Sequence, residues 1–274
     1  MVQLAASMIG TSLDVRHDHS WAHGESTVVE VSGSTGSAWI VKQVRDPATF
    51  AREVWALRAW APRLGEGRAP SLIATDDDRA VLVMDKLPGE SGTADTPDEY
   101  RQAGELIRRL HGAEATAPDP EYPARAAESV DRWVRRLPGI VDDGTLDFVR
   151  AQITLMTSLE PVRRGPVHDD NQPRNWMTDS AGVVRLIDFG KAKTDVQLRD
   201  FERMQHNEWR TGPELRDAFF DGYGRTLTRN EERMLSCVGA VSAVTTVLWA
   251  RAHSDDAFEQ QGWRVLARIR ADVG

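Results

Sequence analysis

The chain has 274 residues, of which 41% are hydrophobic and 28% are charged, and its formal net charge is −8. This length suffices for one large domain or two smaller ones, and the composition excludes a disordered or fibrous protein. The acidic balance argues against a general nucleic-acid binder, because such proteins take most of their affinity from lysine and arginine contacts to phosphates.

The sequence carries no pattern that directs a protein to a membrane or out of the cell. The segment MVQLAASMIGTSLDV lacks the basic start and continuous apolar core of a signal peptide, and no apolar run approaches the about 18 residues that span a bilayer. The single cysteine, Cys237, lies in an apolar helical pattern that is typical of a buried thiol. We therefore expect a cytoplasmic protein with no membrane association.

The first third of the chain predicts a β-hairpin followed by a helix. Residues 27–34 and 38–44 are rich in β-branched and aromatic residues and flank a glycine- and serine-rich turn. Asp46 is the expected N-cap of the helix, because Pro47 and a run of apolar residues at helical spacing follow it. A further strand over residues 79–87 leads into the segment PGESG, where we place the boundary between two lobes.

The remainder of the chain is mainly helical in pattern. Thr96 and Glu99 have the spacing of a capping box at the start of a helix that Gly112 ends. Helical periodicity also covers residues 124–136, residues 144–159 and most of the chain from residue 196 onward. The prediction is an α+β fold with a small β-rich lobe over residues 1–88 and a larger, mainly helical lobe over residues 89–274.

One polar stretch interrupts the helices, GPVHDDNQPRNWMTDSAGVVRLIDFG at residues 165–190. His168, Asp170 and Asn175 have the spacing His-x-Asp-x-x-x-x-Asn, and Asp188 follows at the end of an apolar strand. Phosphoryl transfer needs a carboxylate that accepts the proton of the attacking hydroxyl, and oxygen ligands for magnesium. Asp170 fits the base, and Asn175 and Asp188 fit the Mg²⁺ ligands. The alternative is a polar turn before a buried strand, with Asp188 capping a helix.

The upstream strand and helix supply the cation that this chemistry also requires. Lys42 lies in the apolar strand AWIVKQV, and Glu53 lies in the helix that follows. This order is that of a strand lysine that contacts the donor phosphates and is held by a helix glutamate. A buried lysine needs such a partner, since an unpaired buried charge is costly.

These motifs together resemble the aminoglycoside phosphotransferase and choline kinase-like family, which has the two-lobed protein-kinase-like fold. The resemblance is carried by HDDNQPRNW, LIDFG, WIVKQV, AREVWALRAW and AVLVMDKLPGE. It implies a nucleotide-binding lobe over residues 1–88, a catalytic and substrate-binding lobe over residues 89–274, and ATP or GTP with Mg²⁺ as cofactors. It also implies that Met84 is the gatekeeper behind the adenine ring and that the backbone of Asp85 and Leu87 pairs with the adenine edge.

The sequence departs from the pattern of this family at two places. Asp169 stands where members usually have glycine, and it is either a salt-bridge acid, a substrate-binding acid or a solvated side chain. The expected phosphate loop contains only Gly24 as a glycine, so its phosphate contacts depend on backbone N–H groups near Gly24 and Ser26.

The acceptor is expected to be a small molecule, because no long activation segment and no Ala-Pro-Glu motif follow LIDFG. Acids outnumber arginines over residues 195–221, and one of them, Glu208, is a candidate substrate contact. An acidic wall favours a cationic antibiotic, either an aminoglycoside or a basic peptide, in resistance or self-protection. The alternatives are a metabolite kinase acting on a sugar, an amino alcohol or a biosynthetic intermediate, and a pseudokinase that binds without turnover.

Overall fold

The computed structural model describes residues 1–21, 24–34 and 36–273, which form two compact units. The first unit comprises residues 1–113, 168–193 and 218–224, and the second comprises residues 114–167, 194–217 and the chain from residue 225 onward. Each unit therefore draws on several segments of the chain, and the division predicted after residue 88 stays a prediction.

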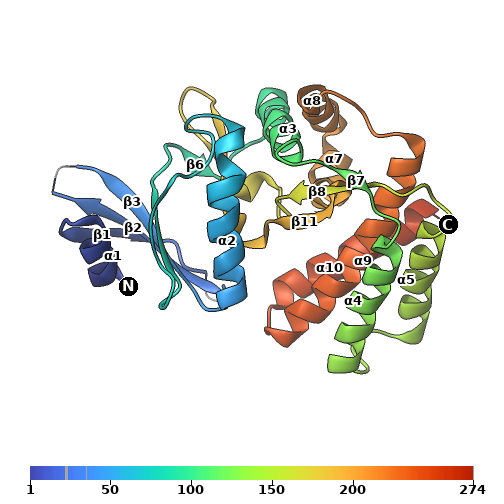
Figure 1. The fold of residues 1–274 in the computed structure, drawn as a ribbon. Helices are drawn as coiled ribbons and strands as arrows, with labels where there is room; N and C mark the ends of the chain where they lie inside the picture. The colour runs from blue at the N-terminus through green and yellow to red at the C-terminus, as the bar shows by residue number, and fades with distance from the viewer. Residues whose placement is uncertain (22–23, 35, 274) are drawn as a thin grey trace. The chain divides into compact units, whose positions relative to one another are not determined.

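The first unit is built on a five-stranded antiparallel sheet with the order β1-β2-β3-β5-β4 (Figure 1). The strands are β1 (Leu13–Asp18), β2 (Ser26–Gly33), β3 (Ala38–Val44), β4 (Leu72–Asp76) and β5 (Val81–Asp85). The predicted hairpin is confirmed, because β2 pairs with β3 from Ser26 opposite Val44 to Ser32 opposite Ala38. Thr35 of its turn lies outside the described residues.

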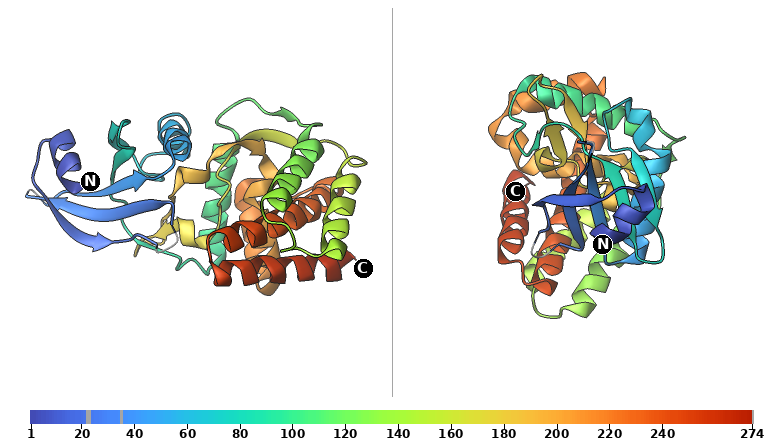
Figure 2. Two further views of the ribbon diagram at one scale, coloured as in Figure 1. Left: turned by 90° about the horizontal axis from the view of Figure 1, so that it is seen from below. Right: turned by 90° about the vertical axis from the view of Figure 1, so that its left-hand side faces the viewer.

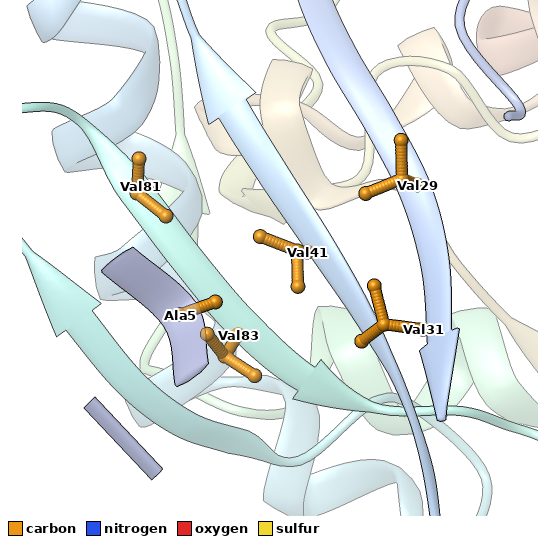
Figure 3. Close-up of a cluster of buried hydrophobic side chains, with 6 residues drawn as sticks. All are labelled: Ala5, Val29, Val31, Val41, Val81 and Val83. Atoms are coloured by element: carbon orange, nitrogen blue, oxygen red, sulfur yellow. The ribbon is translucent and has the colours of Figure 1, made fainter. Parts of the chain in front are cut away.

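A helix that the sequence analysis did not predict, α1 (Val2–Ile9), covers one face of this sheet. Its Ala5 is fully buried against valines from the three central strands, as Figure 3 shows. Val29, Val41 and Val83 lie opposite one another in the register, so they point to the same face. Lys42 follows Val41 and therefore points to the other face of the sheet.

The helix α2 (Pro47–Ala59) lies along that other side of the first unit (Figure 1). Asp46 is its N-cap as predicted, because the carboxylate accepts hydrogen bonds from the backbone N–H groups of Thr49 at 2.9 Å and Ala48 at 3.4 Å. The buried side chains of α2 are Phe50, Glu53, Val54, Ala56 and Leu57. A buried glutamate among apolar residues requires a specific partner.

The remaining elements of the first unit surround the predicted catalytic stretch. They are the 3₁₀ helix η1 (Ala61–Leu64), the helix α3 (Pro97–His111), the 3₁₀ helices η2 (Pro173–Asn175) and η3 (Phe189–Lys191), and the three-stranded sheet β10-β9-β6 formed by β6 (Glu90–Ser91), β9 (Trp176–Thr178) and β10 (Val184–Leu186). The capping box of α3 is confirmed, with Thr96 and Glu99 bonding each other's backbone N–H groups.

The second unit is mainly helical. Its elements are α4 (Tyr122–Arg136), α5 (Asp143–Met156), η4 (Gln197–Asp200), α6 (Glu202–His206), α7 (Glu208–Thr211), the start of α8 (Pro213–Tyr223), α9 (Arg229–Ala252), α10 (Asp256–Val273) and a sheet with the order β11-β8-β7, formed by β7 (Ala117–Pro118), β8 (Arg163–Val167) and β11 (Lys193–Val196). The helices α9 and α10 pack along each other (Figures 1 and 2).

The helix α9 is the core of the second unit. The sequence analysis found no apolar run of membrane-spanning length, but an 18-residue window of α9 reaches a mean hydropathy of 1.4 and passes that test by length and composition. Of this window, 72% is buried inside the fold, as in the core helix of a folded domain. Cys237 lies on its buried face, as predicted, and burial raises the pKa of the thiol to about 11.

Candidate functional site

The predicted phosphate-contact lysine lies at the centre of a buried ion cluster. Lys42 Nζ is 2.8 Å from Glu53 Oε1 and 2.8 Å from Asp188 Oδ1. The Lys42 side chain is 9% exposed and that of Glu53 is 1% exposed, whereas Asp188 is 48% exposed. The structure thus brings together Lys42 of β3, Glu53 of α2 and Asp188 of LIDFG, although Asp188 lies more than a hundred residues after the other two in the sequence.

The electrostatics of this cluster favour a charged lysine and a charged Asp188. Burial opposes the charge on Lys42, but the carboxylates of Asp188 and Glu53 outweigh this effect and raise the pKa of Lys42. The positive charge of Lys42 lowers the pKa of Asp188. Burial raises the pKa of Glu53, and its Oε2 has no hydrogen-bond partner among the described residues. Lys42 therefore balances two carboxylates, of which only Asp188 is open to solvent.

Backbone geometry after the strand β10 places Asp188 in the cluster. Asp188 has φ 61°, a left-handed conformation that turns the chain out of the strand. A Cβ on Gly190 would lie 3.3 Å from Asp188 Oδ1, 3.4 Å from Glu53 Oε2 and 3.6 Å from Lys42 Nζ. The glycine of LIDFG is therefore the residue that lets the backbone pass close to the ion cluster.

The stretch HDDNQPRN folds back on the same hairpin. His168 is fully buried, its Nε2–H donates to the carbonyl of Ile187 at 2.9 Å, and its ring makes an edge contact with Phe189 at 5.1 Å between centroids. The side-chain amide of Asn175 donates to the carbonyl of Asp170 at 2.8 Å. These bonds tie the loop to LIDFG and fix Asn175 relative to Asp170, so His168 supports the loop from inside the fold.

The Asp170 carboxylate is held by groups of its own loop and of LIDFG. Gln172 Nε2 donates to Asp170 Oδ1 at 2.6 Å. Arg174 Nη2 lies 3.0 Å from Oδ2 and 3.3 Å from Oδ1, and Lys191 Nζ lies 3.8 Å from Oδ2. Asp170 is 3% exposed as a residue, so its position is well defined before any substrate binds.

The two predicted magnesium ligands lie at the same end of the β9–β10 hairpin. Leu186 pairs with Trp176, and the N–H of Ile187 donates to the carbonyl of Asn175 at 2.9 Å. Asp188 is the next residue, so its partly exposed carboxylate lies beside Asn175. Because Asn175 uses its NH₂ group on Asp170, its Oδ1 is oriented as an acceptor.

This donor set fits a hard cation such as magnesium. An amide oxygen and a carboxylate are hard oxygen ligands, and Mg²⁺ commonly binds few protein groups together with phosphate oxygens and water. No group of three or more histidines, cysteines, aspartates or glutamates that could hold a metal occurs in the described ranges. A metal in this unit would therefore be held by Asn175, Asp188 and the oxygens of a substrate.

Two of the residues predicted to contact the adenine, Met84 and Asp85, lie in β5, which pairs with the Lys42 strand β3, and Leu87 follows β5. Met84 is 7% exposed in β5, where it pairs with Ile40 and Leu72 of the neighbouring strands. The backbone N–H of Asp85 donates to Ser71 at 3.1 Å, and within the described part of the chain the N–H of Leu87 forms no hydrogen bond. Pairing of the Asp85 and Leu87 backbone with an adenine edge stays a prediction.

The predicted phosphate segment is described only in part, since residues 22 and 23 lie outside the described residues. The N–H of Gly24 donates to the carbonyl of Trp21 at 2.9 Å. Ser26 is the first residue of β2, opposite Val44 of β3. The segment thus enters the strand next to β3, which carries Lys42.

Known proteins match both the sequence and the fold of this chain. A family model described as "Phosphotransferase enzyme family" (APH) matches residues 21–235. The chain belongs to this phosphotransferase family. It is an enzyme family, and the match spans the Lys42 strand, the catalytic stretch and LIDFG.

Solved structures confirm the phosphotransferase fold, α+β with an antiparallel sheet and a helical C-terminal part. A thermostable mutant of aminoglycoside phosphotransferase APH(4)-Ia in a ternary complex with ADP and hygromycin B aligns with TM-score 0.74 and 14% identity, covering 100% of this chain and 99% of that one. Macrolide 2′-phosphotransferase MphH from Brachybacterium faecium aligns with TM-score 0.71 and 16% identity, covering 97% and 96%. The GDP and kanamycin complex of APH(2″)-IIia aligns with TM-score 0.71 and 13% identity, covering 98% and 98%.

In this phosphotransferase the structure brings together Lys42, Glu53, Asp170, Asn175 and Asp188 within the first unit. Their roles as base, metal ligands and phosphate contact stay predictions. The sequence analysis missed Gln172, Arg174 and Lys191, whose polar groups reach Asp170. The signal for two of them was present, since lysine occurs at only a few positions of this arginine-rich chain and Arg174 lies inside the motif itself.

The two predicted substrate contacts of the phosphotransferase have different surroundings. Asp169 has φ 62°, its side chain is 9% exposed, and its Oδ2 lies 2.9 Å from Lys193 Nζ, so of the alternatives above the structure shows the salt bridge. Glu208 begins α7 in the second unit, and burial raises the pKa of its carboxyl. Contact of either residue with a substrate stays a prediction.

Several acids of residues 195–221 have polar partners within their own unit. Asp195 lies 3.7 Å from Arg199 and 3.9 Å from Arg125. Buried Glu202 accepts a hydrogen bond from Ser242 at 2.6 Å. Asp221 accepts one from Arg101 at 2.9 Å. These three acids thus have partners, whereas Glu214 and Asp217 are exposed.

Proposed function

We propose that this phosphotransferase transfers the γ-phosphate of ATP or GTP, with Mg²⁺, to a hydroxyl group of a small molecule in the cytoplasm. The observation that carries the proposal is the contact of Lys42 with both Glu53 and Asp188, in the same unit as Asp170 and Asn175. These residues supply a phosphate cation, a metal ligand pair and a proton acceptor, which is the set that phosphoryl transfer uses.

In the proposed reaction the acceptor oxygen forms a bond to the γ-phosphorus, and the bond from that phosphorus to the β,γ-bridging oxygen breaks. The hydroxyl proton passes to the Asp170 carboxylate, and the nucleoside diphosphate leaves. Lys42 binds the donor phosphates while Glu53 holds its ammonium in place. Magnesium, held by Asn175 and Asp188, supplies charge neutralisation on the phosphates when bound.

For the acceptor we propose a hydroxyl-bearing antibiotic. The fold neighbours support this class, because their structures are described as aminoglycoside and macrolide phosphotransferases and include complexes with kanamycin and hygromycin B. A cationic acceptor, aminoglycoside or basic peptide, heads the panel to be tested. A metabolite kinase is the second candidate, because three of the acids that suggested a cationic acceptor, Asp195, Glu202 and Asp221, have partners within the protein.

The test measures release of nucleoside diphosphate from ATP and from GTP with Mg²⁺ over a panel of aminoglycosides, basic peptides, macrolides, sugars and amino alcohols. Asp170→Asn is expected to lower kcat with the active acceptor by about 10²- to 10⁴-fold while nucleotide binding persists. Asp98→Asn is the control, because Asp98 is an exposed acid of α3 that pairs with Arg101.

The outcomes separate the candidates. Turnover with an antibiotic supports the proposal, and turnover only with sugars or amino alcohols supports the metabolite kinase. Nucleotide binding without turnover on any acceptor supports a pseudokinase. Absence of both nucleotide binding and turnover would remove the phosphotransfer proposal.

A further inference from the structure

Arg174 is a cation placed directly on the proposed catalytic base. It lies in η2, between Asp170 and Asn175, and its Nη2 lies 3.0 Å and 3.3 Å from the two carboxylate oxygens of Asp170. Its side chain is 44% exposed, so the guanidinium is open to an incoming group. Within the described part of the chain its other N–H groups form no hydrogen bond.

On its other side Arg174 contacts the segment that leads to the predicted phosphate loop. Arg174 Cζ lies 6.0 Å from the centroid of the Trp21 ring, within cation–π range. The carbonyl of Trp21 accepts the N–H of Gly24 at 2.9 Å, which links Trp21 to the predicted phosphate segment. Arg174 therefore bridges the base and the entrance of the phosphate segment, all within the first unit.

The chemistry of the reaction brings the transferring phosphoryl group to this place. A base lies about 3 Å from the hydroxyl that it deprotonates, and that oxygen attacks phosphorus from about 3 Å. The phosphoryl group therefore lies within roughly 6 Å of Asp170 during transfer. Arg174 Nη2 lies 3.0 Å from Asp170 Oδ2, so its side chain can reach the phosphoryl group. A guanidinium is always charged and presents donors in a fork that matches phosphoryl oxygens.

Resting on the proposed function, we propose that Arg174 is a further catalytic residue, which binds the oxygens of the transferring phosphoryl group in the transition state. Negative charge spreads over these oxygens as the bond to the leaving diphosphate breaks, and an arginine that meets it lowers the barrier. The chain thereby supplies in its own catalytic loop a cation of the kind that some phosphotransferases receive from elsewhere.

Positioning of the base alone does not account for this arginine. Gln172 already donates to Asp170 at 2.6 Å, and the amide of Asn175 fixes the backbone of Asp170 at 2.8 Å. The pair joins a half-exposed guanidinium to a buried carboxylate, with side chains 44% and 5% exposed, so Arg174 remains open to a further group. The arginine would also weaken Asp170 as a base if it stayed on the carboxylate, and transfer of its donors to the phosphoryl group relieves this conflict.

The binding measurements use a transition-state mimic, so that they need no known acceptor, and the kinetic measurements use the active acceptor found with the panel above. We would measure the affinity of the full chain for MgADP and for MgADP with fluoroaluminate by calorimetry, in the wild type, Arg174→Ala and Arg174→Lys. Arg101→Ala is the matched control, because Arg101 is 41% exposed and also binds carboxylates, those of Asp98 and Asp221. Thermal unfolding of each variant verifies that it is folded.

The expected result is a MgADP affinity within about threefold of the wild type and a loss of about 10²- to 10³-fold in affinity for the fluoroaluminate complex in Arg174→Ala. Arg174→Lys is expected to recover part of this loss. Added guanidinium ion is expected to restore part of the rate at which Arg174→Ala releases nucleoside diphosphate with the active acceptor. Arg101→Ala should bind both complexes as the wild type does.

Three outcomes would overturn the inference. The first is an unchanged fluoroaluminate affinity in Arg174→Ala. The second is a rise in the kcat of this variant, which would mean that Arg174 restrains the base. The third is an effect confined to a higher KM for the acceptor, which would mean that Arg174 binds an anionic group of the acceptor. A wild-type chain that binds neither MgADP nor MgGDP, the second measured in the same way, would instead defeat the proposed function. The two failures are therefore distinguishable.

Discussion

Asp169 forms an ion pair with Lys193, with 2.9 Å between Oδ2 and Nζ, from a backbone conformation of φ 62° that favours glycine. The family pattern has glycine at this position, so the aspartate needs a compensating contact. Aspartate is one of the few residues that enter the left-handed region at modest cost. Lys193, three residues after LIDFG, supplies the charge partner. This pair explains why an acid can stand beside Asp170.

Substitutions at Asp169 should separate backbone strain from the ion pair. Asp169→Ala loses the pair and retains an unfavourable φ, so we expect a loss of about 1–2 kcal/mol in the free energy of unfolding. Asp169→Gly loses the same pair but relaxes the backbone, so its loss should be less than about 1 kcal/mol. Urea denaturation followed by tryptophan fluorescence measures both. Equal losses in the two variants would show that strain at residue 169 contributes nothing.

The parts of the fold and site that were predictable from sequence are those with short-range signals. The Asp46 cap, the Thr96–Glu99 capping box and the β2–β3 hairpin each depend on residues a few positions apart. The Lys42–Glu53 pair was predicted because strand and helix are consecutive.

Long-range contacts and context-dependent helices were not predictable in the same way. The helix α1 has no side-chain N-cap bond, and it is stabilised by burial of Ala5 on strands far along the chain. The contacts of Arg174 and Lys191 with Asp170 depend on the turn of the loop, which no periodicity specifies. The Asp169–Lys193 pair joins two polar segments in the same way.

Replacing Lys42 by methionine should both weaken nucleotide binding and destabilise the protein. The Glu53 carboxylate is 1% exposed and would lose its ion pair with Lys42, so we expect a loss of about 3 kcal/mol in unfolding free energy. The double variant Lys42→Met with Glu53→Gln removes the stranded charge and should recover more than half of that loss. Urea midpoints of the single and double variants test this coupling, and additive losses would contradict it.

Two glycines allow α3 and the end of α8 to touch within the first unit. A Cβ on Gly104 would lie 2.0 Å from the carbonyl oxygen of Phe219, and one on Gly222 would lie 1.8 Å from that of Arg101. These neighbours are backbone atoms, which cannot rotate away. Gly104→Ala should therefore cost about 2 kcal/mol or more in unfolding free energy.

The matched control for Gly104→Ala is Gly112→Ala at the end of the same helix. There a Cβ would lie 3.4 Å from the carbonyl oxygen of Arg108, which is an ordinary contact. Thermal melting should show a clear drop for Gly104→Ala and a small change for Gly112→Ala. Similar melting temperatures for the two variants would mean that the helices separate without loss.

His206 makes the second unit sensitive to acid. It is 3% exposed, and both ring nitrogens are buried without a hydrogen-bond partner among the described residues. Burial lowers the pKa of the imidazole from 6.5 to about 4, with the arginines Arg210 and Arg268 adding to the effect and Asp272 opposing it. The folded state therefore holds a neutral ring at a pH where the unfolded chain already binds a proton.

Stability from this histidine is fully present above pH 6.5 and is lost as the pH falls toward about 4. Between pH 7 and pH 5 we expect it to lower the free energy of unfolding by about 2 kcal/mol. His206→Leu removes the titrating group. Between pH 7 and pH 5 the unfolding free energy of this variant should therefore fall by about 2 kcal/mol less than that of the wild type. His253→Gln, in the same unit, is the control for loss of a histidine. Urea titrations at both pH values measure the difference, and parallel pH profiles for wild type and His206→Leu would contradict the prediction.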